Sequence, residues 1–558
     1  MARLDRLGSA KEVAQIGAAI GREFSHALLS AVVSRPEQEL ASSLDRLIHA
    51  GLLFRQGVPP HATYLFKHAL VQDAAYGTLL REPRRALHAR IANTLESQFA
   101  EIAESQPELL ARHCTEAGLI EKAARLWGKA GQRSLERSAL VEAIEQLTRA
   151  LAQIATLPAT PALRREQIKL QVALLNPLMH VKGYAAREVR AAVDRARLLI
   201  EQAETLGEPP DDPLLAFSIL YGFWVVNQEA LKGDAVREIA AQFLALAQKQ
   251  GATVPVMIGH RLMATSLLIT GDPVASREHF ERAIALYDPA QHRPLATRFG
   301  QDVRVSALAY RSIGRWMLGY PEAALADADH ALQEAREIGQ AATLMFTFNR
   351  AGITHIVCRN YETVIAQCDE RITLAEQKGT LLWKANGILH KGCAFASIGR
   401  ALEGIEMLTA GISAYRSTGA TIYMPLYLLC LATAYAEAAQ LDDAWARICE
   451  SMEYVETNKE RLWEAEANRV AGEIVLQLPQ RNAAKAEGYF ESALAIARAQ
   501  QAKSWELRAV MSMARLWRDQ GKRDEARELL APVYGWFTEG HDTLDLKEAK
   551  ALLEECAS

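Results

Sequence analysis

Apolar residues recur every three or four positions along most of the chain, and short turns interrupt this pattern at nearly constant intervals. The turns begin at Gly233, Gly271, Gly319, Arg359, Gly399, Ala439, Arg481 and Gly521. Their separations are 38, 48, 40, 40, 40, 42 and 40 residues. After each turn comes an amphipathic stretch, such as Ala486, Phe490 and Ala493, and this spacing is typical of a helix. The pattern predicts a helix–turn–helix unit repeated from about residue 105 onward.

One helix pair cannot bury its apolar face alone, so stacked neighbours must supply a continuous core. Small residues such as Ala283 and Ala324 allow close helix approach, and the interval of 48 residues holds an insertion from Pro289 to Arg298. Gly, Ala and an aromatic residue at set offsets resemble tetratricopeptide repeats, whose usual period is ~34 residues. A unit from Glu121 to Ala155 is closer to that family. We therefore expect an all-α fold, an α-solenoid of tetratricopeptide-like helix hairpins.

The first hundred residues have a different pattern. Three short helices are expected at 11–20, 37–50 and 69–80. Between the last two lie apolar runs at 51–57 and 63–66, and the Pro59-Pro60 turn between these runs predicts one β-hairpin. This order suggests a small winged-helix-like module. The predicted domains are 1–100, the module with a following helix, and 101–558, the repeat superhelix with a possible subdivision near 205–213.

Composition and charge narrow the function classes. The chain has 558 residues, of which 50% are hydrophobic, and this excludes a mainly disordered protein. Its net charge of -4 offers no general attraction to nucleic acid. The presumed recognition helix of the front module begins with Glu37 and Glu39, where a DNA-binding helix needs basic residues. Nucleic acid is therefore not expected as a partner.

Residues 417–436 contain no charged side chain and are long enough to span a bilayer. The segment includes Pro425 and falls in register with the repeat, so we expect a buried repeat helix and no membrane partner. The seven cysteines are scattered without a Cys-x-x-Cys pair, as suits a reducing cytosol. The first residues lack the apolar stretch of a signal peptide, and a cytoplasmic location is expected.

No catalytic motif is visible. Gly-Lys occurs at Gly128-Lys129 and Gly521-Lys522, but neither pair is followed by the Ser or Thr of a P-loop. The chain also lacks His-Glu-x-x-His and the Gly-x-Ser-x-Gly elbow. We predict no catalytic residue, no metal ligand and no cofactor, and hence no enzymatic activity of this chain alone.

Two blocks carry a family resemblance. One runs from Phe66 to Tyr76 and continues to Arg84 and His88, and the other covers 516–526, 536–540 and 545–550. Both resemble the C-terminal half of bacterial STAND-type signalling ATPases, often fused to class III adenylate/guanylate cyclase domains. The resemblance covers essentially the whole chain, and residues 2–7 look like the end of a preceding ATPase region. It implies a regulatory, sensing and protein-interaction module, a fragment of a longer architecture whose P-loop and cyclase parts are absent here.

The resemblance also implies a role for His68. In related proteins a histidine that opens the helix after the wing contacts the nucleotide's phosphates and senses the nucleotide when an ATPase domain is present. A helix N-terminus with a histidine suits a phosphate. Here Ala69 stands where many relatives have Asp, so the motif is incomplete. A histidine hydrogen-bonded to a neighbouring loop is the alternative interpretation.

A repeat superhelix usually binds partners in its concave groove, where Arg and Asn can hold a peptide's carboxylates and backbone. The candidate groove residues are Trp224, Asn227, Arg311, Arg315, Asn349, Arg350, Trp383, Asn386, Glu466 and Arg469. The expected partner is a protein, a peptide or a small inducer, with an ATPase or cyclase domain in cis or in trans. A free-standing scaffold and a fragment of a LuxR-type transcriptional regulator are the alternative functions.

Overall fold

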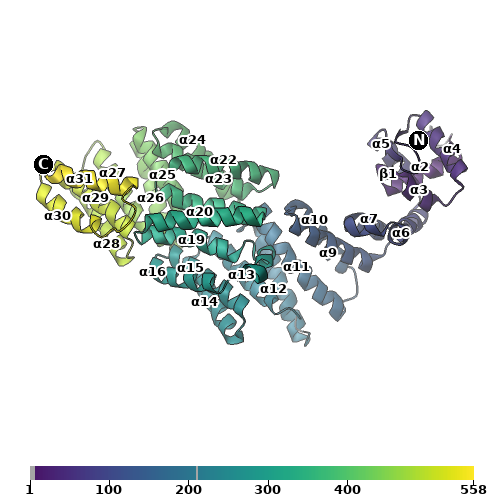
Figure 1. The fold of residues 1–558 in the computed structure, drawn as a ribbon, viewed down its shortest axis with the longest axis horizontal. Helices are drawn as coiled ribbons and strands as arrows, with labels where there is room; N and C mark the ends of the chain where they lie inside the picture. The colour runs from purple at the N-terminus through teal and green to yellow at the C-terminus, as the bar shows by residue number, and fades with distance from the viewer. Residues whose placement is uncertain (1–6, 209–210, 558) are drawn as a thin grey trace. The chain divides into compact units, whose positions relative to one another are not determined.

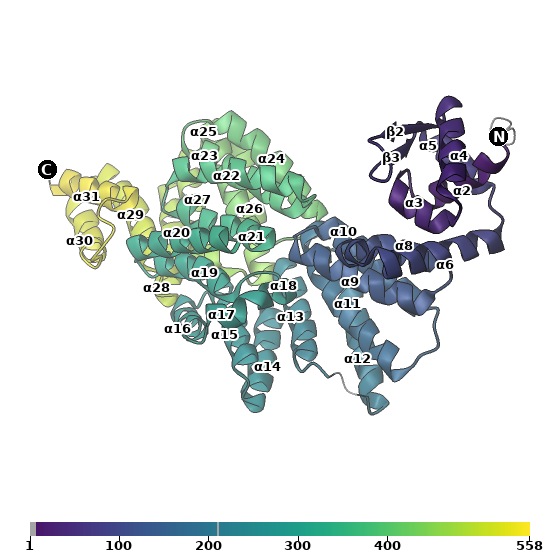
Figure 2. The ribbon, with the colours of Figure 1, turned by 45° about the vertical axis from the view of Figure 1, so that its right-hand side comes forward.

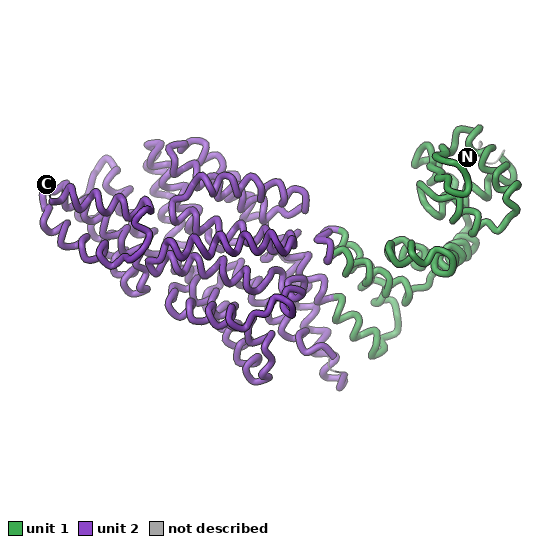
Figure 3. Tube along the Cα trace, viewed as in Figure 1, with its two compact units in different colours: residues 1–134, 142–170 green, residues 135–141, 171–558 purple. Residues whose placement is uncertain are grey.

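The computed structural model describes residues 7–208 and 211–557, which are almost entirely helical. Contacts within the chain divide it into two compact units (Figure 3). The first comprises residues 1–134 and 142–170, and the second comprises 135–141 and 171–558. The possible subdivision near 205–213 includes residues 209–210, and the ATPase-like stretch at 2–7 falls mostly on residues 1–6. Residues 1–6 and 209–210 lie outside the described residues.

The first unit begins with a small mixed module. Its elements are α2 (Ser9–Ile20), β1 (Glu23–Ser25), α3 (His26–Val33), α4 (Glu37–His49), β2 (Leu53–Gln56), β3 (Thr63–Phe66) and α5 (Ala69–Gly77). The strands form one antiparallel sheet in the order β1-β3-β2, with Tyr64 of β3 between Phe24 and Arg55. Leu29, Leu44 and other apolar side chains fill the core under it.

The predicted hairpin is confirmed as β2 and β3, but the expectation of a single hairpin was incomplete. The third strand, β1, has only three residues, too few to show the alternation that marks a strand. Pairing with β3 creates it. Helix α3 was also missed. It begins at the N-cap Ser25, whose side chain accepts a hydrogen bond from the backbone of Leu28.

The rest of the first unit is helical, and its last helices cross into the second unit (Figure 1). The helices are α6 (Arg81–Gln98), α7 (Ala100–Ser105), α8 (Pro107–Glu116), α9 (Ile120–Glu136), α10 (Leu140–Ile154) and α11 (Pro161–Lys182). Helices α9 and α10 form the early repeat unit that the sequence predicted. A Cβ atom at Gly131 would lie 2.6 Å from the Leu147 side chain, so glycine is what permits this close helix approach.

The second unit consists of stacked helix pairs. Its elements are α12 (Arg187–Thr205), α13 (Leu214–Glu229), α14 (Gly233–Gln250), α15 (Thr253–Ile269), α16 (Pro273–Ala285), α17 (Pro289–His292), η1 (Arg293–Leu295), α18 (Ala296–Phe299), α19 (Val303–Met317), α20 (Pro321–Ile338), α21 (Ala341–Val357), α22 (Tyr361–Gln377), α23 (Leu381–Ser397), α24 (Ala401–Ser417), α25 (Met424–Glu437), α26 (Leu441–Asn458), η2 (Arg461–Trp463), α27 (Glu464–Gln477), α28 (Ala483–Ala499), α29 (Lys503–Asp519), α30 (Arg523–Tyr534) and α31 (Leu544–Ala557). The expected all-α solenoid of tetratricopeptide-like hairpins is confirmed.

The turns lie where the period predicted them. Gly271 and Gly319 have φ values of 90° and 92°, in the left-handed region that ends a helix. Arg359 and Ala439 adopt the same region with φ of 60° and 58° although they carry side chains. The Pro-marked insertion forms α17, η1 and α18.

The uncharged segment at 417–436 belongs to the repeat, as predicted. Most of it forms α25, whose Tyr427, Leu428 and Ala432 are fully buried against neighbouring helices. Among the residues that the structure describes, no helix combines the length and apolar character needed to cross a bilayer.

The superhelix of the second unit turns tightly enough that distant repeats touch. The backbone amide of Thr421 donates to the carbonyl of Glu229, 192 residues away, at 2.7 Å. The amide of Gly540 donates to Glu322, 218 residues away, also at 2.7 Å. Helix α29 therefore lies beside α19 (Figures 1 and 2). One superhelical turn takes about five repeats of ~40 residues, and side chains fill much of its inner face.

Candidate ligand-binding cavity

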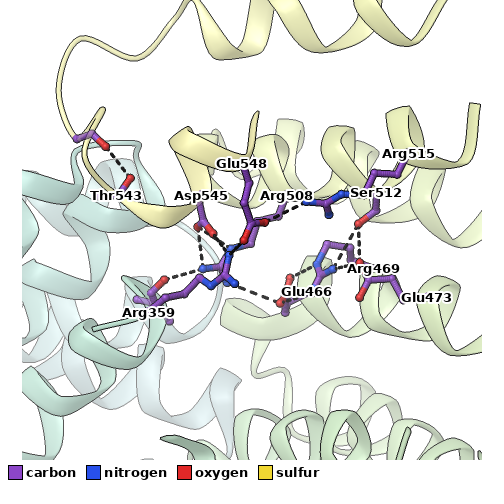
Figure 4. Close-up of polar contacts among 12 residues, drawn as sticks. Arg359, Glu466, Arg469, Glu473, Arg508, Ser512, Arg515, Thr543, Asp545 and Glu548 are labelled. Atoms are coloured by element: carbon purple, nitrogen blue, oxygen red, sulfur yellow. Dashed lines mark hydrogen bonds and ion pairs between the residues drawn. The ribbon is translucent and has the colours of Figure 1, made fainter. Parts of the chain in front are cut away.

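A cavity of about 310 Å³ lies among the inner helices of the last repeats. It is lined by the ends of α21 and α23 and by α25, α27, α29 and α31. Apolar side chains, among them Leu426, Leu429 and Val470, form part of the wall. The charged lining consists of Arg359, Arg469, Arg508 and Arg515 with Glu437, Glu466, Glu473, Asp545 and Glu548. Four arginines thus face five carboxylates, and most of these side chains appear in Figure 4.

Arg469 is held at the floor of the cavity by residues of two helices. Its guanidinium donates to both carboxylate oxygens of Glu466 at 2.7 Å and also to Glu473. Ser512 of α29 donates to Glu473 at 2.9 Å and accepts from Arg469 at 3.3 Å. Burial alone would raise the pKa of Glu466, but the charge and hydrogen bonds of Arg469 bring it below its usual value. Glu466 is therefore ionised, and its ion pair with Arg469, made through two hydrogen bonds, is rigid.

Arg508 lies beside this pair, with its Nη1 atom 3.7 Å from Glu466. It donates from Nε to Asp545 of α31 at 2.8 Å and from Nη2 to the carbonyl of Val357 at 2.6 Å. The guanidinium carbon lies 5.0 Å from the Trp316 ring centroid and 5.3 Å from that of Trp505. Cation–π contact and ion pairing together fix this buried charge.

Helix α31 also neutralises two arginines at the rim. Glu548 pairs with Arg359 at 2.7 Å and with Arg515 at 3.0 Å. Arg359 is the turn residue in the left-handed region, and this backbone conformation aims its side chain at α31. The three arginines come from two repeats and their acidic partners from the last helix, so the wall exists only in the folded superhelix.

Glu437 differs from the other carboxylates. It is the last residue of α25, its side chain lines the cavity but is exposed, and its partial burial raises its pKa. Within residues 7–208 and 211–557, no cation or hydrogen-bond donor is paired with it. Since the arginines are all matched to other carboxylates, the cavity retains one unbalanced negative charge at this position.

The structure brings two of the sequence-predicted groove residues, Glu466 and Arg469, into this cavity. Trp224 and Trp383 are buried in the repeat packing, where their indole groups donate to Ser266 at 2.9 Å and to His180 at 3.2 Å. Arg350 is also buried, 3.3 Å from Glu229 and stacked among aromatic rings such as Tyr423.

The remaining candidates make contacts within the helix packing, some between helices and some within one helix. Arg311 and Arg315 share Asp327, with contacts of 2.7 Å and 3.0 Å. Asn349 is buried beside Arg350, and the side chain of Asn386 accepts from Tyr427 at 3.0 Å. Asn227 donates to the carbonyl of Phe223, one helical turn before it on α13.

Sequence reasoning missed most of the cavity's charged lining, namely Arg359, Glu437, Glu473, Arg508, Arg515, Asp545 and Glu548. One feature of the sequence could have pointed to some of these residues. Arg508 and Arg515 are seven residues apart on a helix where apolar residues are expected to face inward. Charged residues at buried helix positions need partners, and the acidic pair Asp545 and Glu548 has matching helical spacing.

His68 lies at the end of β3 as the N-cap residue of α5, and its side chain is exposed. Most of α5 is only partly covered, and Leu70 is 80% exposed. The rest of the Phe66–Tyr76 block has a packing role, because Tyr76 contacts His88 at 3.0 Å and His88 contacts His113 at 2.8 Å. Burial lowers the pKa of His88 to about 4 and that of His113 to about 3.

Comparisons with known proteins give one curated relative. The chain is 26% identical over 522 residues to an uncharacterized protein of Rhizobium meliloti (strain 1021), covering 92% of this chain and 49% of that protein. The chain thus spans about half the length of this relative. No known family profile matches the chain.

Several solved structures show distant similarity. A Rap protein complexed with competence and sporulation factor is 11% identical, covering 69% of this chain and 99% of its own, with a TM-score of 0.49. A STAND protein with a tetratricopeptide repeat sensor from Pyrococcus horikoshii is 12% identical, covering 97% and 65%, with a TM-score of 0.30. Yeast Tom70 is 11% identical, covering 86% and 96%, with a TM-score of 0.31.

Proposed function

We propose that the repeats bind a short peptide segment through the charged cavity, and that this segment presents a basic side chain to Glu437. The observation that carries the proposal is the unpaired Glu437 in a cavity whose arginines are all matched to other carboxylates. A lysine or arginine of the ligand would restore charge balance there. Because the Glu437 side chain is exposed, such a pair should contribute up to about 1 kcal/mol to binding.

The rest of the wall suits a peptide. Leu426, Leu429 and Met511 contribute apolar surface to the same cavity as Glu437. The hydroxyl groups of Ser397 and Thr433 also line the cavity and can bond a peptide backbone. The volume of about 310 Å³ is near the lower end of the ~300–1,000 Å³ range of ligand pockets, so the cavity fits part of a chain rather than a folded domain.

A positional library of short peptides, measured by fluorescence anisotropy against the full chain, tests the proposal. We expect Lys or Arg to be enriched at one position. Glu437→Gln keeps the size of the side chain and removes its charge, and it should weaken the selected peptides up to about fivefold. Glu403→Gln on α24 is the matched control, because it removes an exposed carboxylate that does not line the cavity.

Two results would count against this function. One is a library without any enriched basic position. The other is a selected peptide that binds the Glu437→Gln and Glu403→Gln variants equally well.

We further propose that the chain is a regulatory and sensing module of a bacterial STAND-type ATPase/adenylate cyclase, with no catalysis of its own. The order α2, β1, α3, α4, β2 and β3 supports a winged-helix-like module, in which a hairpin wing accompanies three helices. The exposed His68 and the thinly covered α5 support a surface on which an ATPase domain packs, in cis or in trans. Peptide binding in the repeats would then be transmitted through this module.

The DNA upstream of the codon for Met1 tests this finer proposal. A reading frame with a Gly-x-x-x-x-Gly-Lys-Ser/Thr loop supports it. Without such a loop or a cyclase domain, the free-standing scaffold becomes the better account, since the repeats would serve it equally. Stable partners held by the repeats after deletion of residues 1–100 would also favour the scaffold. Salt-sensitive DNA binding would favour the LuxR-type alternative.

A further inference from the structure

A second cavity, of about 440 Å³, lies where repeats one superhelical turn apart meet. Val274 and Arg277 of α16, Leu318 and Tyr320 beside the α19–α20 turn, and Trp536 after α30 contribute to its wall. The turn from α28 to α29 completes it with Arg498, Gln501, Lys503 and Glu506. It shares no lining residue with the first cavity.

The charge of this cavity is opposite to that of the first. Three cations, Arg277, Arg498 and Lys503, face a single carboxylate, Glu506. Glu506 accepts from Arg498 at 2.9 Å and from Lys503 at 2.6 Å, so one negative charge holds two positive groups in place. Arg277 has only a weak contact, 3.9 Å from Glu281 on its own helix. With Glu281 counted, the three cations exceed the carboxylates that contact them by one positive charge.

The aromatic part of the wall is rigid and accessible. A Cβ atom at Gly319 would lie 2.4 Å from the Trp536 ring, so the ring packs on a backbone position that only glycine leaves open. Tyr320 packs beside it, with ring centroids 5.8 Å apart. Trp536 is nevertheless 38% exposed, and the Lys503 ammonium group lies over its ring, 5.6 Å from the centroid. A base that stacks on this face must therefore move the ammonium group toward its own phosphates.

We propose that this second cavity binds a nucleotide, with its base stacked on Trp536 and its phosphates held by Arg277, Arg498 and Lys503. Stacking on an aromatic side chain accepts any base, because every base has a π-face. Arginine matches the geometry of phosphate oxygens, and lysine acts as a point charge. Three cations can contact more oxygens of a polyphosphate than of a monophosphate, and the volume of about 440 Å³ lies within the usual range of small-molecule pockets.

Calorimetric titration of the full chain with ATP, GTP, AMP, adenosine and inorganic phosphate tests the site. ATP and GTP should bind with one-to-one stoichiometry and within a few-fold of each other, and AMP more weakly. Arg277→Ala and Trp536→Leu should each weaken ATP about tenfold. Arg197→Ala is the matched control, because Arg197 is also an exposed arginine with a weak same-helix contact, 3.8 Å from Glu201.

Several results would overturn the proposal. No heat of binding with ATP up to about 1 mM would do so. So would inorganic phosphate binding as tightly as ATP, because the aromatic surface would then have no role. Equal loss of affinity in Arg277→Ala and Arg197→Ala would place the nucleotide elsewhere on the chain. Since the two cavities share no residue, none of these results bears on peptide binding at Glu437.

Discussion

Replacing Asp545 by Asn tests whether α31 is held on the superhelix by its charges. Asp545 is 15% exposed and contacts Arg508 at 2.8 Å and Arg359 at 3.4 Å. Asparagine keeps the size of the side chain but removes the charge and turns an amide group toward two guanidinium groups. The first of these, Arg508, is itself only 14% exposed, so solvent compensates little for the lost charge.

The contacts of Asp545 set the expected loss of unfolding free energy in Asp545→Asn. Breaking a buried ion pair typically costs ~3–5 kcal/mol, and one hydrogen bond to a charged group contributes ~1.5–3 kcal/mol. Arg508 keeps its bond to the carbonyl of Val357, and Arg359 keeps Glu548. Because these contacts remain, we expect a loss of about 2 kcal/mol in the free energy of unfolding. The apolar packing of α31 through Leu546 and Leu552 is unchanged.

Urea unfolding of Asp545→Asn, Arg508→Met and the double variant forms a cycle that isolates the pair. The coupling energy should be at least ~1 kcal/mol. Repeat arrays can unfold in parts, so amide exchange in α31 should locate the change. The control cycle uses Arg336 and Glu370, a half-exposed pair at 2.6 Å, with coupling under ~0.5 kcal/mol. Equal coupling in the two cycles, or unchanged exchange in α31, would refute the reasoning.

Two other predictions concern stability. Burial lowers the pKa of His88 to about 4 and of His113 to about 3. The unfolded chain therefore takes up protons first, and unfolding free energy should fall as pH drops from ~6.5 toward 4, by up to ~1.4 kcal/mol per pH unit for each histidine. Urea titrations of the wild type and His88→Gln check this, and equal slopes in the two proteins would contradict it. Gly319→Ala should cost about 1–3 kcal/mol, because its φ is 92° and the new Cβ would meet Trp536 at 2.4 Å. The control Gly399→Ala has a similar φ of 81° and open space around it, so its denaturation midpoint should fall less, and an equal fall would exclude the Trp536 contact as the cause.

The front module shows where local pattern stops being informative. The β2–β3 hairpin has a Gly/Pro-marked turn and enough residues for a strand pattern, and it was predicted. The three residues of β1 become a strand only because Phe24 comes to lie opposite Tyr64. Helix α3 follows β1 with almost no connecting residues, which hides its start from a search for long periodic segments.

The candidate site likewise contains contacts that local sequence predicts and contacts that it does not. Glu466 and Arg469 are three residues apart on one helix, so their pairing follows from helical geometry and could be predicted. The pairing of Arg359 with Asp545 and Glu548 spans 186 and 189 residues. Glu437 carries no local sign of its position on a cavity wall. Glu437 lacks a partner because the four arginines of the cavity pair with other carboxylates, and this pairing is set by the tertiary structure.

The sequence by itself determined that this protein is a stack of helix hairpins, because helical periodicity and the recurring turns are properties of neighbouring residues. Only the tertiary structure decided how far each repeat rotates against the next. Small rotations at every helix interface accumulate until repeats about 200 residues apart meet. That meeting buries Arg350 and Trp383 and leaves two cavities of opposite charge, and no local pattern encodes it.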